Sequence, residues 1–215
     1  MNFTKQVEKS AYSFALYISK QRWNSIWHQI DEIIQMQPSN ILEIGPGSGL
    51  LNMILKLNKF CVETVDIDPE LNPDHVASVT KMPFVNNAFE LVCAFQVLEH
   101  LPYEKALCAF EEMARVSEKK IIISLPDAKP IWSYSFYIPF LGSRHFTLTR
   151  PFSRKKLHKF DGEHYWEVNK IGYELDKVLN DLSKFMCLIQ TYRVEENPTH
   201  RFFIFEHYPH LRNKE

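Results

Sequence analysis

The amino-acid sequence predicts an α/β domain in which helices cover a mostly parallel sheet. Between residues 40 and 127, short apolar runs alternate with segments of helical periodicity, which is the pattern of successive strand–helix units. The runs are apolar on both faces, as in strands that lie between two layers of helices. Near the C-terminus the runs 185–193 and 201–208 flank a turn that contains Asn197-Pro198, which indicates an antiparallel hairpin.

The elements follow one another in a clear order. Residues 3–18 and 23–34 have helical spacing, and Pro38 ends the second of these helices. We expect the tryptophans of that helix, Trp23 and Trp27, to face the core. The strands predicted next are 41–44, 61–65, a weak 75–78, 91–95 and 120–125, and the helices between them are 48–57 and 103–117.

Length and composition indicate one compact domain. The 215 residues include 25 Lys and Arg against 26 Asp and Glu. This balance excludes a generally basic nucleic-acid coat and a disordered acidic tail. Hydrophobic residues make up 45% of the chain and supply a core. The N-terminus has no signal-peptide pattern and no stretch reaches the ~18 apolar residues of a membrane span, so we expect a cytoplasmic protein.

The four cysteines, Cys61, Cys93, Cys108 and Cys187, form no CxxC pair and have no metal-ligand spacing. Cys61 and Cys93 lie in apolar runs that predict buried strands. We therefore expect reduced core thiols and no metal site.

Half of the six glycines lie in one loop, Gly45-Pro46-Gly47-Ser48-Gly49, between a predicted strand and a predicted helix. Glycine allows a ligand to approach the backbone, and a helix N-terminus attracts an anionic group. Leu50 stands where the dinucleotide fingerprint G-x-G-x-x-G needs its third glycine, and the Gly-Lys-Ser/Thr of a P-loop is absent. Glu43 ends the strand and suits an ammonium group. The loop therefore favours an amino-acid zwitterion over a pyrophosphate, with a tight turn that binds nothing as the alternative.

The next predicted strand ends at Val65-Asp66-Ile67. Asp66 follows Gly45 by 21 residues, a position from which a carboxylate accepts two hydrogen bonds from a ribose diol. Ile67 would then lie against the flat face of a base. A plain surface turn is the alternative role for Asp66.

These features, together with the segments 78–84 and 89–101, resemble the class I S-adenosylmethionine-dependent methyltransferases, in particular their methyltransferase type 11 branch. The resemblance covers about residues 40–127. It implies a Rossmann-like fold with a seven-stranded, mostly parallel sheet flanked by helices, the last strand being antiparallel. It also implies S-adenosyl-L-methionine as cofactor and S-adenosyl-L-homocysteine as product.

The resemblance implies a role for each motif residue on the methionine and ribose side. Gly45, Gly47 and Gly49 would line the methionine and ribose of the cofactor, with Glu43 beneath its amino group. Asp66 would hold the ribose hydroxyls.

On the adenine and methyl side, Ile67 would pack on the base. Ser78 stands where the family usually has an aspartate that accepts the adenine N6 proton. Serine accepts it without a charge, so adenine binding would depend more on the Val79 backbone. Phe95 and Gln96 would face the sulfonium and its methyl group.

We expect one methyltransferase domain, 1–215, with four parts. These are N-terminal helices in 1–37, a cofactor-binding half in 40–127, a substrate-side insertion or lid in 128–168, and a C-terminal helix with a β-hairpin in 169–215. The N-terminal helices would cap the cofactor site or pack on the sheet.

The substrate-side segment has an unusual composition. Residues 130–142 are strongly aromatic, and residues 144–160 carry six basic residues and no acidic one: Arg144, Arg150, Arg154, Lys155, Lys156 and Lys159. An aromatic wall beside a basic rim suits an acceptor with an apolar or sugar face and an anionic group. The same patch suits RNA or an acidic lipid surface, and a solvated basic loop is the alternative. The candidate substrate-binding residues are Tyr134, Tyr137, Arg144, His145 and Tyr165.

His164 is the candidate catalytic residue. It lies in the polar, aromatic segment 161–167, its imidazole titrates near neutral pH, and Glu163 would orient it. His145 and His100 are weaker candidates, and an acceptor that is already ionised needs no base. This segment and residues 193–203 also resemble bacterial methyltransferases of surface-polysaccharide synthesis.

The predicted function is methyl transfer to a small-molecule or glycan-linked acceptor. One alternative is a non-catalytic adenosyl-binding regulator whose acceptor cavity is filled by residues 130–142. Another is an RNA or protein methyltransferase, although Phe95-Gln96-Val97-Leu98 replaces the Asn-Pro-Pro-Tyr signature of nucleobase amino methylation. Leu50 disfavours a nicotinamide dehydrogenase. The sequence leaves the oligomeric state open and gives no indication of a specific nucleic-acid partner.

Overall fold

The computed structural model describes residues 7–208, apart from the side chains of Ser143 and His145. Its main sheet has seven strands in the order β3-β2-β1-β4-β5-β9-β8. Pairing is parallel from β3 to β5, whereas β9 is antiparallel to both of its neighbours. This confirms the predicted fold class. The strands are β1 (Ile41–Ile44), β2 (Val62–Asp66), β3 (His75–Val76), β4 (Phe89–Phe95), β5 (Ser117–Pro126), β8 (Cys187–Arg193) and β9 (His200–Glu206).

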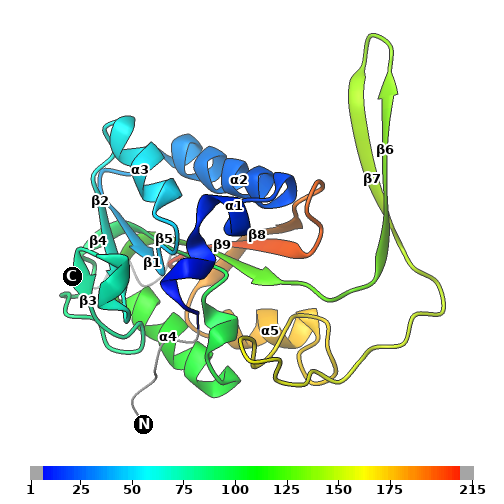
Figure 1. Cartoon of the computed structure of the whole chain (residues 1–215). Helices are drawn as coiled ribbons and strands as arrows, with labels where there is room; N and C mark the ends of the chain where they lie inside the picture. The colour runs from blue at the N-terminus through cyan, green and yellow to red at the C-terminus, as the bar shows by residue number, and fades with distance from the viewer. Residues whose placement is uncertain (1–6, 209–215) are drawn as a thin grey trace.

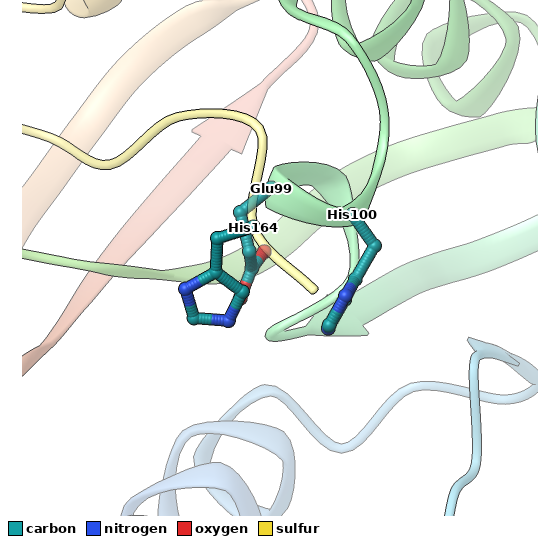
Figure 2. A group of neighbouring side chains, drawn as sticks. All are labelled: Glu99, His100 and His164. Carbon is teal, nitrogen blue, oxygen red and sulfur yellow. The ribbon is translucent and has the colours of Figure 1, made fainter. Parts of the chain in front are cut away.

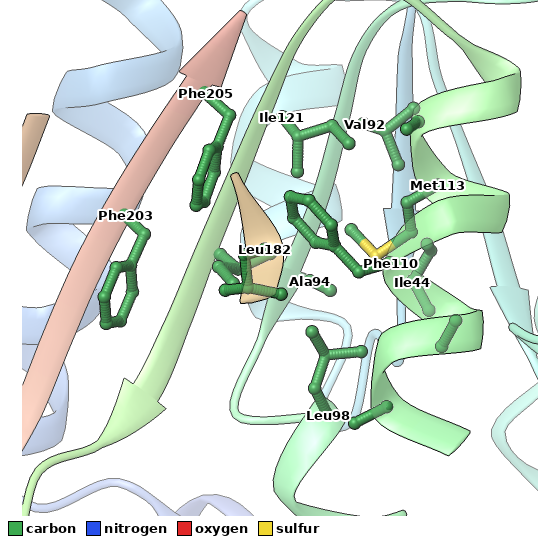
Figure 3. Close-up of a cluster of buried hydrophobic side chains, with 14 of the residues drawn as sticks. Ile44, Val92, Ala94, Leu98, Phe110, Met113, Ile121, Leu182, Phe203 and Phe205 are labelled. Carbon is green, nitrogen blue, oxygen red and sulfur yellow. The ribbon is translucent and has the colours of Figure 1, made fainter. Parts of the chain in front are cut away.

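Helices cover both faces of this sheet (Figure 1). On one face α2 (Lys20–Met36) and α3 (Leu50–Leu57) bury Ile33, Leu51 and Leu55. On the other face α4 (Tyr103–Val116) and α5 (Leu175–Leu182) bury Phe110, Met113 and Leu182 against β4, β5 and β9 (Figure 3). The strands are therefore apolar on both sides because both sides are covered.

The N-terminal region corrects two expectations. The described part of residues 3–18 forms a 3-10 helix, η1 (Lys9–Tyr12), and one turn, α1 (Phe14–Tyr17), separated by an extended Ser13. The next helix, α2, begins where the Ser19 side chain accepts a hydrogen bond from the Arg22 N–H at 3.1 Å. It buries Ile26 and Ile33 and leaves Trp23 and Trp27 exposed, so the tryptophans do not face the core.

A second sheet has only two strands, β6 (Ile131–Ile138) and β7 (Gly142–Thr149). This hairpin projects from the body of the protein (Figure 1). The sequence predicts an aromatic segment here but no strands. The missed signal is the alternation of Trp132, Tyr134 and Phe136 with small polar residues, followed by Gly142 at φ +77°.

The buried carboxylate of Asp127 lies between the end of β5 and the start of the hairpin. Both Asp127 oxygens accept hydrogen bonds, from Arg193 and Arg201 at the ends of β8 and β9, from the Asn169 amide and from the Lys129 backbone N–H. Burial alone would raise the pKa of Asp127. The two guanidinium groups outweigh burial and hold this pKa below its usual value.

The four cysteines are free, and only Cys93 is fully buried, so the expectation that Cys61 also lies in the core is wrong. Cys61 precedes β2 and is exposed, because the strand begins one residue later than predicted. Among residues 7–208, none of the helices combines the length and the apolar character that crossing a bilayer requires.

Candidate cofactor and active site

A cavity opens at the carboxyl ends of β1, β2 and β4, where ligands bind in open parallel sheets. It holds about 970 Å³ of empty space that is continuous with solvent. Its lining includes eight of the ten predicted cofactor-binding residues: Gly45, Gly47, Asp66, Ile67, Ser78, Val79, Phe95 and Gln96.

The glycine loop requires glycine at its first two positions for reasons of space. All three of its glycines have positive φ, +68° at Gly45, +53° at Gly47 and +70° at Gly49. A Cβ on Gly45 would lie 2.6 Å from Cγ2 of Val97, and one on Gly47 would lie 3.0 Å from the Tyr12 ring. Gly49 has open space around it and forms the N-cap of α3 outside the cavity lining. The loop is thus a tight turn whose backbone faces the cavity.

Asp66 ends β2 at the cavity wall. Its Oδ1 accepts a hydrogen bond of 2.8 Å from the Asp68 backbone N–H, which fixes the orientation of the carboxyl group. Burial raises the pKa of Asp66 above its usual value. The predicted adenine-side residue Ser78 shares a 2.9 Å hydrogen bond with the Thr80 hydroxyl.

Glu43 lies beneath the loop, in a smaller adjoining cavity of about 430 Å³. The side chain is buried, and its Oε2 has no hydrogen-bond partner among the described residues. Burial raises the pKa of Glu43 to about 8. The cavity also reaches Arg22 and His200, and burial lowers the pKa of His200 to about 4. An unpartnered carboxyl oxygen here fits the need for a cation, such as the ammonium group of a methionine.

The N-terminal segment supplies part of the cavity wall, and no sequence motif pointed to its individual residues. Tyr12 and Tyr17 line the main cavity, with ring centroids 5.2 Å apart. The Arg22 guanidinium lies 4.2 Å from the centre of the Tyr17 ring. Burial raises the pKa of Tyr12 to about 12, and the charges of Tyr17, Asp66 and Glu163 add to this effect. These residues are far from the loop in sequence, and only a general expectation of capping pointed to them.

A group of acidic and imidazole side chains lies together beside the cavity: Glu99, His100 and His164 (Figure 2). His100 lines the cavity, and its ring centroid is 5.1 Å from that of His164. The predicted partner of His164 was Glu163, but it is Glu167 Oε1 that lies 3.4 Å from His164 Nδ1. Glu163 instead accepts a 3.1 Å hydrogen bond from His100 Nδ1 through its backbone carbonyl.

The two imidazoles have opposite electrostatic surroundings. The hydrogen bond to Glu167 raises the pKa of His164, with Glu99 and Asp161 adding to the effect. Burial lowers the pKa of His100, and the neighbouring His164 lowers it further. Glu99 is fully buried, which raises its carboxyl pKa to about 7.

The predicted substrate-binding residues are not brought together. Tyr134, Tyr137 and Arg144 lie on the β6–β7 hairpin and are not part of the described cavity lining. The His145 side chain lies outside the described residues. Tyr165 packs on Phe160, with ring centroids 4.6 Å apart, and its N–H donates to the Glu99 carbonyl at 2.9 Å. Acceptor binding by these residues stays a prediction.

Comparison with known proteins points to one family. Residues 42–123 match the family described as a methyltransferase domain. A search of curated proteins finds no match. Solved structures of similar fold include an S-adenosylmethionine-dependent methyltransferase from Clostridium acetobutylicum. It is 11% identical, with a TM-score of 0.58 over 92% of this chain and 95% of that chain.

Two further solved structures hold S-adenosylhomocysteine. One is 1,6-didemethyltoxoflavin-N1-methyltransferase from Burkholderia thailandensis, which also holds 1,6-didemethyltoxoflavin. It is 10% identical, with a TM-score of 0.60 over 92% of this chain and 84% of that chain. The other is the N-methyltransferase NodS from Bradyrhizobium japonicum, 11% identical, with a TM-score of 0.57 over 90% of this chain and 91% of that chain. At these identities the likeness shows a shared fold. The family match over β1 to β5 shows that residues 42–123 of this chain form a methyltransferase domain.

Proposed function

We propose that this chain binds S-adenosylmethionine in the cavity beside the glycine loop. The methyl group then passes to a small-molecule or glycan-linked acceptor, and S-adenosylhomocysteine is released. Acceptors that carry an anionic group are included in this proposal. The observation that supports this most is the convergence of eight predicted cofactor residues from separate strand ends on one cavity.

Each wall of the cavity suits one part of the cofactor. The backbone of Gly45 and Gly47 allows close approach of the methionine and ribose. Asp66 suits the ribose hydroxyls, because its Oδ1 is already held by the Asp68 N–H and the carboxyl group is thereby oriented. Glu43 is unpartnered and would become charged when an ammonium group enters its surroundings.

S-adenosylmethionine, when bound, supplies an electrophilic methyl group on a sulfonium. The acceptor lone pair forms the new bond to the methyl carbon, and the electron pair of the broken carbon–sulfur bond stays on sulfur. Most of the catalytic effect of this chain's residues then comes from alignment. For a hydroxyl or amine acceptor, His164 would take the proton on Nε2, because its Nδ1–H donates to Glu167.

Substitution of the ribose-side carboxylate tests the cofactor site. We expect Asp66→Asn to weaken S-adenosylhomocysteine binding by about 10- to 100-fold, since charge-assisted hydrogen bonds contribute ~1.5–3 kcal/mol. Calorimetry measures this, with the exposed Asp176→Asn on α5 as the matched control. Equal affinity in the wild-type protein and Asp66→Asn would contradict the ribose assignment.

The acceptor is best sought with labelled cofactor. Labelled methyl transfer to fractions of a cell extract identifies the acceptor class, and His164→Asn run in parallel tests the base. Full activity of His164→Asn would remove His164 from the proton transfer.

The non-catalytic alternative required residues 130–142 to fill the acceptor cavity, whereas they belong to the projecting hairpin (Figure 1). The cytoplasmic location stays a prediction.

A further inference from the structure

Glu99 is an unusual residue for its surroundings. Its side chain is fully buried, and neither carboxylate oxygen has a hydrogen-bond partner among the described residues. A buried carboxylate without partners is costly, and such groups in proteins are normally paired, protonated or bound to a metal ion. In Figure 2 the Glu99 carboxyl group lies next to the His164 ring, and the His100 ring lies on the far side of Glu99 from His164.

The three side chains are close enough to share one ion. Glu99, His100 and His164 each offer a ligand atom, and these atoms lie within 4.8 Å of one another. Two imidazoles and one carboxylate are a ligand set that Zn²⁺, Co²⁺ and Fe²⁺ accept. Three protein ligands leave coordination positions open, and His100 borders the cofactor cavity.

The hydrogen bonds of the two imidazole rings are also of the kind that metal-binding histidines form. His100 Nδ1–H donates to the Glu163 carbonyl at 3.1 Å, and His164 Nδ1 lies 3.4 Å from Glu167 Oε1. Histidines that bind metals usually donate their other ring N–H to a carbonyl or carboxylate in this way. Nε2 of each ring is then the nitrogen with a free lone pair.

A neighbouring group competes for the same imidazole. Asp161, His164 and Glu167 also offer atoms within 4.8 Å of one another. However, Asp161 Oδ1 accepts the backbone N–H groups of residues 163 and 164, and Glu167 Oε2 lies 3.3 Å from the Lys170 amine. These carboxylates are already satisfied, whereas that of Glu99 is not.

We propose that Glu99, His100 and His164 bind one divalent transition-metal ion beside the cofactor cavity, which His100 lines, and that the ion holds an oxygen atom of the acceptor. This proposal differs from the expectation of no metal site, which rested on cysteine spacing. Only the acceptor part rests on the proposed methyltransferase function. A bound hydroxyl loses its proton to solvent more readily, and its oxygen then forms the bond to the methyl carbon while the carbon–sulfur electron pair stays on sulfur. His164 is in this case a ligand and not the base, because both roles use Nε2.

Cobalt and zinc titrations of the full-length, chelator-treated protein test the site. We expect one Co²⁺ per chain with a visible absorption band, and displacement of Co²⁺ by Zn²⁺. Glu99→Gln and His164→Asn should each weaken Co²⁺ binding by at least about tenfold. Asp161→Asn and His207→Asn, whose imidazole contacts the Ser117 carbonyl at the start of β5, should leave it unchanged. Thermal unfolding of each variant shows whether it is folded.

Several results would overturn the metal site. These are no Co²⁺ binding by the wild-type protein, binding that Glu99→Gln leaves intact, or binding that Asp161→Asn abolishes. A wild-type protein that binds Co²⁺ but no S-adenosylhomocysteine would instead contradict the proposed function. If methyl transfer to the identified acceptor is insensitive to chelation, the metal does not hold that acceptor.

The β6–β7 hairpin carries a second, independent inference. One of its faces is apolar, since Trp132 lies opposite Leu148 and Tyr134 opposite Phe146, the latter rings being stacked at 5.0 Å. The tip, Phe140 and Leu141, is exposed. A free ribbon with an apolar face and tip requires a partner or an apolar medium.

The charge of the segment indicates which partner. Residues 128–160 contain no acidic residue, and six basic residues follow the tip: Arg144, Arg150, Arg154, Lys155, Lys156 and Lys159. Lys155 lies 3.4 Å from Glu174, at the base of the segment. Apolar tips with a basic rim are suited to the interface of an anionic bilayer.

We infer that the hairpin docks the protein on an anionic membrane surface, with Phe140 and Leu141 inserted between the lipids. Sedimentation with phosphatidylcholine vesicles, with and without phosphatidylglycerol, tests this. We expect binding only with phosphatidylglycerol, weaker at high salt, and reduced at least about tenfold in Phe140→Ser/Leu141→Ser. Leu57→Ser, at an exposed leucine of α3, is the matched control.

Equal sedimentation of the tip variant and the wild-type protein would overturn this inference, as would no binding to either vesicle. A dimer in analytical ultracentrifugation that the tip variant abolishes would also overturn it, because the hairpin would then pair with a second copy of the chain.

Discussion

Two segments leave the carboxyl edge of the sheet, the glycine loop after β1 and the β6–β7 hairpin after β5, and they differ in what surrounds them. Gly45 in the loop and Gly142 in the hairpin turn both have positive φ, +68° and +77°. A Cβ on Gly45 would meet Val97 at 2.6 Å, whereas one on Gly142 would have nothing within 4 Å. A positive φ therefore has a different structural role in each segment. In the loop it shapes a cavity, and in the hairpin it only reverses the chain.

The polar groups of the two regions differ in the same way. Around the loop, Glu43 and Glu99 are buried with shifted pKa values and unpartnered oxygens, which points to ligands. In the hairpin and the segment after it, the charged side chains are exposed. Chemistry is thus concentrated at the cavity, and surface recognition at the hairpin.

The largest expected effect is on the free energy of unfolding, and it concerns Asp127, which lies between the sheet and the hairpin. Asp127→Asn removes the charge that pairs with Arg193 and Arg201, and breaking such a buried pair costs about 3–5 kcal/mol. Urea unfolding at pH 7 measures the loss, with exposed Asp176→Asn as control. Because the pKa of Asp127 is lowered in the folded state, its stabilisation is present above the usual value of 3.8 and is lost as the pH falls through the lowered pKa. The variant should therefore lose less stability than the wild-type protein on acidification below pH 4, and an equal loss would contradict the assignment.

A pair of alanine substitutions tests the difference between the glycines directly. Gly45→Ala combines backbone strain of about 1–3 kcal/mol with overpacking against Val97. We expect it to weaken S-adenosylhomocysteine binding by about tenfold or more. Gly142→Ala carries similar strain but no clash, and calorimetry should show unchanged affinity. Equal losses in both variants would mean that the Val97 contact has no role.

A smaller effect concerns the proton on Glu43. With its pKa raised to about 8, this carboxyl group is mostly protonated at pH 7 in the free protein. The ammonium group of the ligand favours the charged form, so binding should release up to one proton at pH 7 and fewer as the pH rises above 8. Calorimetry in buffers of different ionisation enthalpy counts the protons. Glu43→Gln should abolish the release, and a release that persists in Glu43→Gln would assign it to another group.

The smallest effect is expected from removal of the hairpin. Replacing residues 131–149 with a short Gly-Ser linker removes exposed aromatic side chains and none of the described cavity lining. S-adenosylhomocysteine affinity should stay within about twofold and the unfolding midpoint within a few degrees. Loss of vesicle binding with retained S-adenosylhomocysteine binding would separate the two regions by function. A large loss of cofactor affinity would show that they are coupled.

Sequence reasoning was most successful where strands and their ends carry the signal. The strand β1 was predicted without error, and the glycine loop and Asp66 converge on the cavity because parallel strands present their carboxyl ends at one edge. It failed where contacts are distant in sequence. Tyr12 reaches Gly47 across 35 residues, and Glu99 meets His164 across 65, and no periodicity links such pairs. The exposed Trp23 shows the same limit, since a helical pattern does not say which of two apolar faces is covered.

The parallel strand–helix pattern and the meeting of the glycine loop and Asp66 at one cavity thus follow from the order of residues, since they depend on local conformation and on the geometry common to parallel sheets. The grouping of Glu99, His100 and His164, the choice of Glu167 as hydrogen-bond partner and the projection of the hairpin depend on folding. The physical reason is that burial and charge act through space. The pKa of Glu99 and the exposure of Phe140 are set by neighbours whose distance along the chain carries no information about their distance in the folded protein.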